Sequence, residues 1–264
     1  MNSNISNLPR VGFFGTGEKE YGHGGSGIEK LLEKVKSGDI QAIVALIVSN
    51  YSNGGVKEKA DKFNIPFHHM TGFPKRESNG KFSEENLQVI REIYQKIIRE
   101  NNLEYVFLSG LLNYVAGLKP HKTVNVHPGP TQEGYGGKGM YGMHVHRKIW
   151  EDYKAGKINQ TCVTMHYVTD KFDDPKFTIV QVPVTLEDCN SEDDVKNKVN
   201  KMEHIIQWKI TQMVISEAIK WTGNENDKIE IDTDVAESFK FLEGTVFGGM
   251  LDLQGGISYE NRLI

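Results

Sequence analysis

Short apolar segments and amphipathic segments alternate through the first two thirds of the chain, and this order constrains the fold more than any other feature. Ile43 to Val48 is apolar throughout, which is typical of a strand covered on both faces. Leu87, Ile90, Tyr94 and Ile97 recur at helical spacing after Ser83, a residue suited to begin a helix. The alternation predicts an α/β fold, with a Rossmann-like, open, mostly parallel sheet and helices on both faces.

The same periodicities divide the chain into two parts. Strands are expected at 161–168 and 178–184, and a helix at 144–153. A last long helix is expected from Ser191 to Gly223. We therefore expect a catalytic domain over residues 1–223 and a C-terminal extension over residues 224–264 whose role the sequence does not indicate.

Composition narrows the classes of protein to consider. The chain has 264 residues, a net charge of −4 and two cysteines, too few for a disulfide framework. The longest apolar run, Ala42 to Val48, is far shorter than the roughly 20 residues of a membrane helix. The first residues lack the apolar core of a secretory signal. These features favour a cytoplasmic protein with no membrane contact and no nucleic-acid partner.

A glycine-rich loop, Gly15 to Gly27, follows the first expected strand. Its end, Gly22 to Gly27, matches the pattern G-x-G-x-x-G, but the glycines come late and no carboxylate follows the second strand. One reading is a flexible loop. The other is a phosphate cradle, in which the backbone N–H groups of Gly25 to Gly27 meet the positive end of a helix.

Polar residues also follow later strands. Asn125 and His127 alternate onto one side at the carboxyl end of a strand, where open α/β sheets bind ligands. A lone histidine is as often structural as functional, but a second polar segment, Val168 to Asp174, can bring a carboxylate to it. Glu203 and His204 alone are typical of a solvated helix face. The other histidines, His68, His69, His144 and His146, lack a zinc-binding spacing, so no metal is expected.

Taken in order, these segments resemble the folate-dependent formyltransferases, from about Val11 to Gly223. The resemblance is strongest for the branch that acts on glycinamide ribonucleotide in purine synthesis. The matching segments are the glycine loop with its helix, Leu108-Ser109-Gly110, Asn125-x-His127-Pro128, His166 to Asp173, Val182-Pro183-Val184 and Glu203-His204.

The resemblance implies roles for individual residues. Asn125, His127 and Asp173 match the catalytic trio. The family residues that bind the acceptor correspond here to Gly25, Ser26, Gly27 and Glu203. The family residues that bind the folate pterin correspond here to Leu112, Asn113, Tyr114, Val115, Val168 and Asp170. Departures from the family pattern, such as Gly129-Pro130 after His127-Pro128 and a glycine-rich stretch at 134–142, affect the acceptor side.

The implied function is transfer of a formyl group from 10-formyltetrahydrofolate, as co-substrate, to glycinamide ribonucleotide. Alternatives are a formyltransferase for a nucleotide-sugar amine, a 10-formyltetrahydrofolate hydrolase, and a non-catalytic nucleotide-binding protein on the same scaffold. Asn125 and a charged His127 would donate hydrogen bonds to the oxyanion. Asp173 is expected to raise the pKa of His127 above that of an ordinary histidine.

Overall fold

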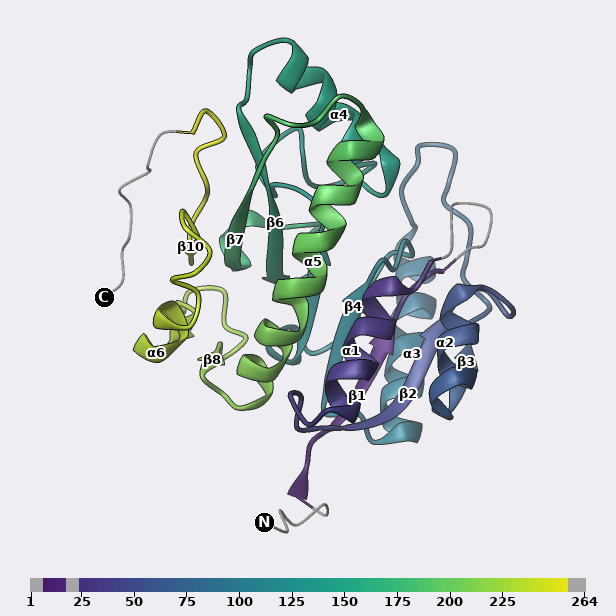
Figure 1. Cartoon of the computed structure of the whole chain (residues 1–264). Helices are drawn as coiled ribbons and strands as arrows, with labels where there is room; N and C mark the ends of the chain where they lie inside the picture. The colour runs from purple at the N-terminus through teal and green to yellow at the C-terminus, as the bar shows by residue number, and fades with distance from the viewer. Residues whose placement is uncertain (1–6, 18–23, 256–264) are drawn as a thin grey trace. The chain divides into compact units, whose positions relative to one another are not determined.

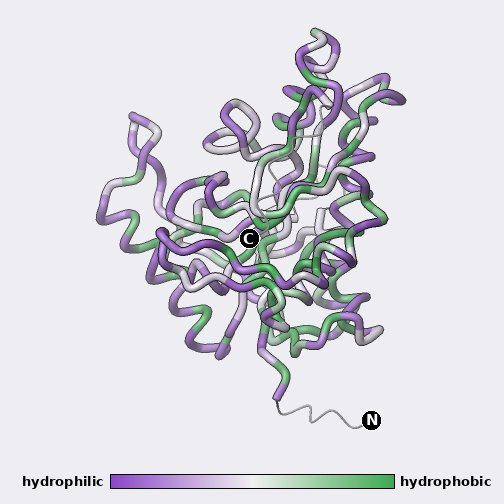
Figure 2. The backbone as a smooth tube through the Cα atoms, turned by 90° about the vertical axis from the view of Figure 1, so that its left-hand side faces the viewer, coloured by the Kyte–Doolittle hydropathy of each residue, from purple (hydrophilic) through white to green (hydrophobic). Residues whose placement is uncertain are grey.

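The computed structural model describes residues 7–17 and 24–255 and divides the chain into two compact units, Met1–Thr123 and Val124–Ile264. The units are called unit 1 and unit 2 below, and Figure 1 shows the helices and strands of each. Hydrophobic and hydrophilic residues alternate along the helical segments, as the colours of Figure 2 show. This is the pattern expected of helices that bury one side.

Unit 1 is built on four parallel strands in the order β4-β1-β2-β3. The strands are β1 (Arg10–Phe14), β2 (Ile43–Ser49), β3 (Phe67–His69) and β4 (Tyr105–Ser109). The helices are α1 (Ser26–Lys36), α2 (Gly55–Phe63) and α3 (Glu84–Asn101), followed by the short helix η3 (Pro120–Lys122). Right-handed connections place α1 and α2 on one face of the sheet and α3 on the other. The predicted α/β fold, with parallel strands and helices on both faces, is confirmed.

The strand order of unit 1 reverses at β1. The chain runs from β1 outward through β2 and β3, then returns to β4 on the other side of β1. Two buried aromatic residues hold α3 against the sheet, since the ring centroids of Phe14 and Tyr94 lie 6.3 Å apart. Open α/β sheets bind ligands outside the carboxyl ends of the strands at such a switch point. The loops after β1 and β4 therefore occupy the position where a site is expected.

Unit 2 has antiparallel strands in the order β5-β6-β7-β10. They are β5 (Thr123–His127), β6 (Gln160–Tyr167), β7 (Thr178–Thr185) and β10 (Val246–Phe247). The other elements are α4 (Met143–Lys154), η4 (Pro175–Phe177), α5 (Glu192–Ile215), the ribbon β8 (Ile219–Lys220) with β9 (Glu230–Ile231), and α6 (Thr233–Glu237). The change from parallel to antiparallel pairing was not specified by the sequence pattern.

Three helix boundaries test the sequence reading. Ser83 and Ser191 begin α3 and α5 as predicted, since each hydroxyl accepts a backbone N–H three residues later. The predicted end of α5 at Gly223 was wrong. The helix ends at Ile215, Glu217 takes a left-handed φ of 60°, and buried Ile219 pairs with Ile231 in the β8–β9 ribbon. Apolar residues of that ribbon therefore extended the helical pattern beyond the helix.

Residues 224–255 belong to unit 2. Strand β10 pairs with β7, with Val246 opposite Gln181. Val246 and Leu251 are buried with Cys162 of β6, and Leu253 packs against them. The described part of the C-terminal extension thus contributes to the core of unit 2.

Candidate active site

Strand β5 carries Asn125 and His127 to its carboxyl end, as the alternation predicted. In the antiparallel pairing of β5 with β6, Asn125 lies opposite His166. The Asn125 Nδ2 atom lies 3.0 Å from His166 Nε2. Both histidine side chains are almost fully buried, with 4% of His127 and 3% of His166 exposed. The two strands therefore place one amide and two imidazoles in a largely water-free environment.

The loop after β6 brings the Asp173 carboxylate to this group. Its Oδ1 atom lies 3.3 Å from His166 Nε2, and its Oδ2 atom lies 3.7 Å from His127 Nδ1. The backbone N–H of Gly137 donates to Oδ2 at 2.9 Å. Asp173 has a left-handed backbone, with a φ of 43°, which aspartate tolerates better than most residues. The structure thus brings the predicted trio together and adds His166 as a fourth member.

Electrostatics keep Asp173 ionised. Burial alone would raise the pKa of this carboxyl. The hydrogen bond with His166, the two nearby imidazoles and the Gly137 N–H outweigh burial and lower the pKa to about 2. The anion is therefore present throughout the neutral range.

The expected rise in the pKa of His127 was wrong. Burial lowers the pKa of His127, and the attraction of Asp173 opposes this effect without reversing it. The nearby imidazole of His166, which also contacts Asp173, disfavours a positive charge on His127. A buried imidazole loses more hydration energy on charging than one carboxylate returns, so His127 is neutral near pH 7.

Hydrogen bonds then assign the protons on both rings. His127 Nε2 lies 3.0 Å from the backbone oxygen of Tyr135, and a carbonyl only accepts, so Nε2 carries the proton. His166 Nδ1 lies 3.0 Å from the Tyr167 carbonyl and likewise carries a proton. The Nε2 atom of His166 faces both Asn125 and Asp173.

A tight turn contacts His127 and Asp173 through its backbone. The Gln132 carbonyl accepts the N–H groups of Tyr135 and Gly136 at 3.0 and 3.2 Å. The Tyr135 hydroxyl donates to Asp152 at 2.7 Å, and Asp152 is buried beneath Lys148 and Lys157. We call residues 132–137 the catalytic turn, because its Tyr135 carbonyl and Gly137 N–H contact His127 and Asp173.

The glycine loop and the start of α2 lie against each other in unit 1. Gly25, the N-cap of α1, has a φ of 93°, and a Cβ there would lie 3.2 Å from Val56. The closest approach is at Gly55, where a Cβ would lie 2.0 Å from the carbonyl oxygen of Gly24. The helix begins at Ser26, so Ser26 and Gly27 are in its first turn, where N–H groups lack partners inside the helix. Gly22 and His23 of the predicted motif lie outside the described residues.

The two loops at the switch point are joined by hydrogen bonds. Thr16 Oγ1 accepts the N–H of Leu112 at 2.8 Å, and the Thr16 N–H donates to Gly110. Tyr114 is held through its carbonyl, which accepts the Tyr94 hydroxyl at 3.2 Å. Asn113 and Val115 are half-buried in the same loop, and the Leu112 side chain is 47% exposed. Unit 1 thus brings the loop predicted to bind the acceptor to the segment predicted to bind the pterin.

The remaining predicted residues lie in unit 2. Val168 is half-buried and Asp170 exposed in the loop between β6 and Asp173. Glu203 lies on α5, where its Oε2 atom accepts from Asn200 Nδ2 at 3.2 Å. Burial raises the pKa of Glu203 to about 7, which the Asn200 hydrogen bond only partly offsets. Glu203 is therefore not the ordinary surface carboxylate that its position on a helix suggested.

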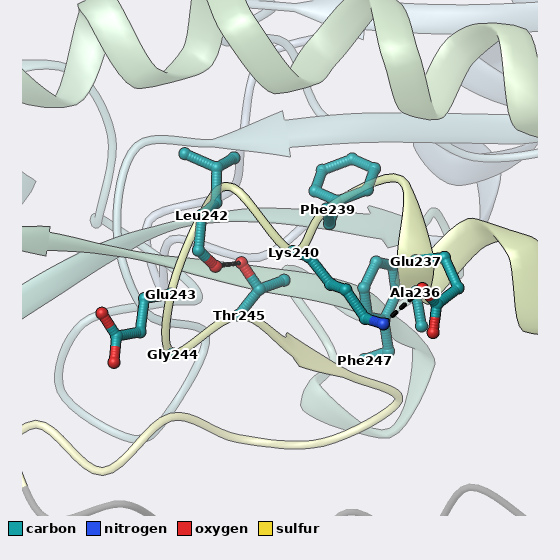
Figure 3. Close-up of a pocket in the computed structure, with 9 residues that line it drawn as sticks. All are labelled: Ala236, Glu237, Phe239, Lys240, Leu242, Glu243, Gly244, Thr245 and Phe247. Atoms are coloured by element: carbon teal, nitrogen blue, oxygen red, sulfur yellow. Dashed lines mark hydrogen bonds and ion pairs between the residues drawn. The ribbon is translucent and has the colours of Figure 1, made fainter.

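Other features carry no predicted site residue. The hollow drawn in Figure 3 has a volume of about 350 Å³ and is lined by the segment 236–247, including Phe239, Lys240 and Phe247.

Within residues 7–17 and 24–255, no three histidine, cysteine or acidic side chains are grouped to hold a metal. Over the same residues, no helix is both long and apolar enough to cross a membrane.

Comparison with known proteins identifies the family. A model described as formyl transferase matches residues 21–211, well over half of the chain. The chain belongs to the formyl transferase family. This assignment agrees with the resemblance carried by the glycine loop, Asn125-x-His127-Pro128 and Asp173.

Several curated relatives of this formyl transferase family member are similar over most of the chain. The chloroplastic phosphoribosylglycinamide formyltransferase of Arabidopsis thaliana is 26% identical over 204 residues, which cover 75% of this chain and 64% of that protein. The phosphoribosylglycinamide formyltransferase of Schizosaccharomyces pombe is 26% identical over 73% of this chain and 93% of its own length. The chain spans 60 to 64% of the length of the three plant relatives that it matches.

Solved structures show the same fold. Glycinamide ribonucleotide transformylase 1 from Symbiobacterium toebii matches with a TM-score of 0.66 and 17% identity, over 85% of this chain and 94% of that one. A formyltetrahydrofolate deformylase from Pseudomonas syringae matches with a TM-score of 0.63 and 14% identity, over 86% of this chain and 67% of that one. The α/β fold of this formyl transferase family member is therefore that of the solved formyltransferases.

Proposed function

We propose that this formyl transferase family member transfers a formyl group from 10-formyltetrahydrofolate to the amino group of glycinamide ribonucleotide. The observation that carries the proposal is the contact of one ionised carboxylate, Asp173, with both His127 and His166, beside the Asn125 amide. A binding protein has no need of an anion buried between two imidazoles. A reaction that moves a proton while an oxyanion forms does need one.

The reaction has one bond formed and one broken. The acceptor nitrogen attacks the formyl carbon, giving a tetrahedral oxyanion, and the bond from that carbon to the folate nitrogen then breaks. Asn125 Nδ2 and the Nε2–H of His127 are the donors available to the oxyanion. In the free site His127 donates this proton to the Tyr135 carbonyl, which holds the ring in place for the substrate oxygen that would share the proton. A neutral His127 imidazole can stabilise the oxyanion, because its Nε2–H donates a hydrogen bond without a positive charge.

Asp173 accepts the proton that the acceptor amine loses, directly or through water. Its pKa of about 2 would make it a weak base, but that value reflects the free site, where His166 holds the anion. His166 Nε2, 3.3 Å from Asp173 Oδ1, is the neighbouring group through which that proton can leave the carboxylate. The proton then passes to the folate nitrogen that leaves, and tetrahydrofolate is released.

Substrate contacts follow from the family resemblance. We assign the acceptor to Gly25, Ser26, Gly27 and Glu203, and the pterin to Leu112, Asn113, Tyr114, Val115, Val168 and Asp170. The first turn of α1 supports the acceptor assignment, since a helix N-terminus with glycines suits a phosphate. We also infer a catalytic domain over residues 1–223, an extension over residues 224–264, and a cytoplasmic protein that acts on small molecules without nucleic acid or membrane.

The test measures tetrahydrofolate release from 10-formyltetrahydrofolate with a panel of amine acceptors and with water alone. Release that depends on glycinamide ribonucleotide supports the proposal. Release with water alone identifies a hydrolase, release with a nucleotide-sugar amine identifies the other transferase, and no release identifies a binding protein. Asp173→Asn should abolish turnover, whereas Asp174→Asn should not, because Asp174 caps η4 and pairs with Lys171 rather than with His127 or His166.

A further inference from the structure

The segment after α6 crosses unit 2. It lies C-terminal to residues 21–211, which the family model matches. Residues 246–254, which we call the C-terminal strap, begin with β10 on the edge of β7. The backbone continues with Gly248 N–H donating to the Ile179 carbonyl at 2.9 Å. The Leu253 carbonyl accepts the N–H groups of Asn159 and Gln160 at 2.8 and 3.3 Å. The strap is therefore hydrogen-bonded to both β7 and the start of β6.

Two glutamines connect the strap to the loop that follows β5. The Leu251 N–H donates to Gln181 Oε1 at 2.7 Å, and Gln132 Nε2 donates to the Leu251 carbonyl at 3.0 Å. Gln181 is fully buried, and its Nε2 atom lies 3.2 Å from Gln132 Oε1. The two glutamines and the backbone N–H and carbonyl of Leu251 thus form a closed ring of three hydrogen bonds.

Gln181 also holds the residues just before the catalytic turn. Its Nε2 atom lies 3.1 Å from Thr164 Oγ1 and 3.4 Å from Thr131 Oγ1. The Thr164 hydroxyl in turn donates to the Gly129 carbonyl at 2.7 Å. Gly129, Thr131 and Gln132 are therefore all held, directly or through Thr164, by one buried side chain.

The catalytic turn needs such an anchor. Glycines stand at 134, 136 and 137 within it, and a glycine-rich backbone loses more entropy on ordering than any other. The turn begins at Gln132, whose carbonyl accepts the N–H groups of Tyr135 and Gly136. From there the Tyr135 carbonyl reaches His127, and the Gly137 N–H reaches Asp173. A shift at Gln132 therefore moves the two backbone groups that fix the imidazole and the carboxylate.

We propose that the C-terminal strap positions the catalytic turn, and that Gln132 and Gln181 are the positioning residues that link the Leu251 peptide group to His127 and Asp173. This inference rests on the proposed catalytic roles of His127 and Asp173. Neither glutamine touches substrate. They act by holding the turn, and a displacement of reacting groups of about 1 Å can lower a rate about 100-fold.

The test compares two identical substitutions that loosen the same strap. Gln132→Met keeps the length of the side chain but loses the hydrogen bonds with Leu251 and Gln181. Gln160→Met is the matched control, because Gln160 Nε2 donates to the Asp252 carbonyl at 2.7 Å and Gln160 lies at the start of β6, outside the catalytic turn. Both variants should lower Tm slightly.

Only Gln132→Met should change the site. We expect its kcat to fall on the order of tenfold while KM for both substrates stays within about twofold. The ¹⁵N chemical shifts of His127, recorded without substrate, should show Nε2 less fully protonated in Gln132→Met than in the parent. If Gln132→Met does not fold, Gln132→Asn, which is too short to reach both partners, should give the same pattern.

The nuclear magnetic resonance measurement keeps this proposal separate from the proposed function. A shifted His127 signal in Gln132→Met but not in Gln160→Met supports positioning by the strap even if the acceptor is another amine. The proposal is overturned if both variants leave the His127 signal unchanged, or if both change it equally. In the first case the strap would act on stability alone, and in the second any loosening of the strap would disturb the site without a special role for the two glutamines.

Discussion

The Nε2 atom of His166 lies 3.3 Å from Asp173 Oδ1, closer than the 3.7 Å between His127 Nδ1 and the other carboxylate oxygen. His166 is thus the nearer partner of the anion, although the family pattern directs attention to His127. The Asn125 amide lies on the same nitrogen of His166. We therefore expect His166 to take part in the proton pathway, and this predicts a measurable role for it.

His166→Phe keeps a buried ring but removes the nitrogen that Asp173 contacts. The pKa of Asp173 should rise, because the hydrogen bond with His166 that lowers it is lost, and kcat should fall about tenfold or more. His166→Gln, whose amide can still donate to the carboxylate, should recover part of the loss. The measurement is kcat against pH for both variants, with Tm recorded to show that they are folded. An unchanged profile in His166→Phe would contradict the role.

Gly136 is the position in the catalytic turn that least tolerates a side chain. A Cβ there would lie 2.9 Å from Thr131 Cα and 3.0 Å from the Thr131 carbonyl oxygen, both backbone atoms. Gly136→Ala should therefore displace the turn and lower kcat more than it lowers Tm. At Gly139 a Cβ meets nothing within 4 Å, although its φ is 90°. Gly139→Ala should cost only about 1–2 kcal/mol of stability, from its left-handed φ, and leave kcat nearly unchanged. Equal kcat values in the two variants would show that the turn does not control the site.

Glu203 should make acceptor binding depend on pH near neutrality. Because burial raises its pKa to about 7, the carboxylate that would accept hydrogen bonds from the acceptor forms only as pH rises through about 7. KM for the acceptor should therefore fall from pH 6 to pH 8, with KM for the folate unaffected. Glu203→Gln should remove this contribution and raise the acceptor KM at pH 8, while slow hydrolysis of the formyl donor is spared. A parallel loss of hydrolysis would assign Glu203 to the catalytic group or to the fold.

His146 on α4 should make the fold sensitive to mild acid. Burial, followed by the charges of Lys196 and His127, lowers the pKa of His146 to about 4, with Glu192 opposing them weakly. Its Nδ1 atom is buried and has no hydrogen-bond partner among residues 7–17 and 24–255. Below the ordinary histidine pKa the unfolded chain binds the proton and the folded one does not. The free energy of unfolding then falls as pH falls, by on the order of 2 kcal/mol between about pH 7.5 and pH 5.

Urea unfolding of His146→Phe at these two pH values tests this sign. The variant should lose less stability than the parent on acidification. The matched control is His144→Phe, two residues earlier on the same helix and exposed, which should behave like the parent. The opposite contribution of Glu203, whose raised pKa favours the folded state in acid, cancels in this comparison. An identical acid response in all three proteins would contradict the assignment.

The sequence indicated the strands well and the shorter elements poorly, for physical reasons. Strands such as β2 are apolar throughout because helices cover both faces, and this pattern is visible without a structure. Helix α2 was not predicted, because it begins after Gly54 and with Gly55, residues typical of loops. Those glycines are there for close backbone contact with Gly17 and Gly24, which no local pattern reveals.

The site shows a similar division. The family motif indicated Asn125, His127 and Asp173, and the structure brings their side chains together. His166 was visible within the quoted motif but was not selected, although the pairing of β5 with β6 places it opposite Asn125. The contacts from the Tyr135 carbonyl and the Gly137 N–H come from backbone atoms, so the residue types in the sequence do not indicate them. The direction of the His127 pKa depends on burial, which only the assembled core determines.

The left-handed backbone at Asp173 restricts evolution at this position in a way that is separate from acid–base chemistry. Only glycine, asparagine and aspartate adopt that conformation at little cost, and glycine supplies no oxygen for the Gly137 N–H. Glutamate, the usual conservative replacement, would carry the charge but oppose the turn. Asparagine adopts the turn but lacks the charge, so functional homologues should keep aspartate here, and drift to glutamate should require a reshaped loop between β6 and β7.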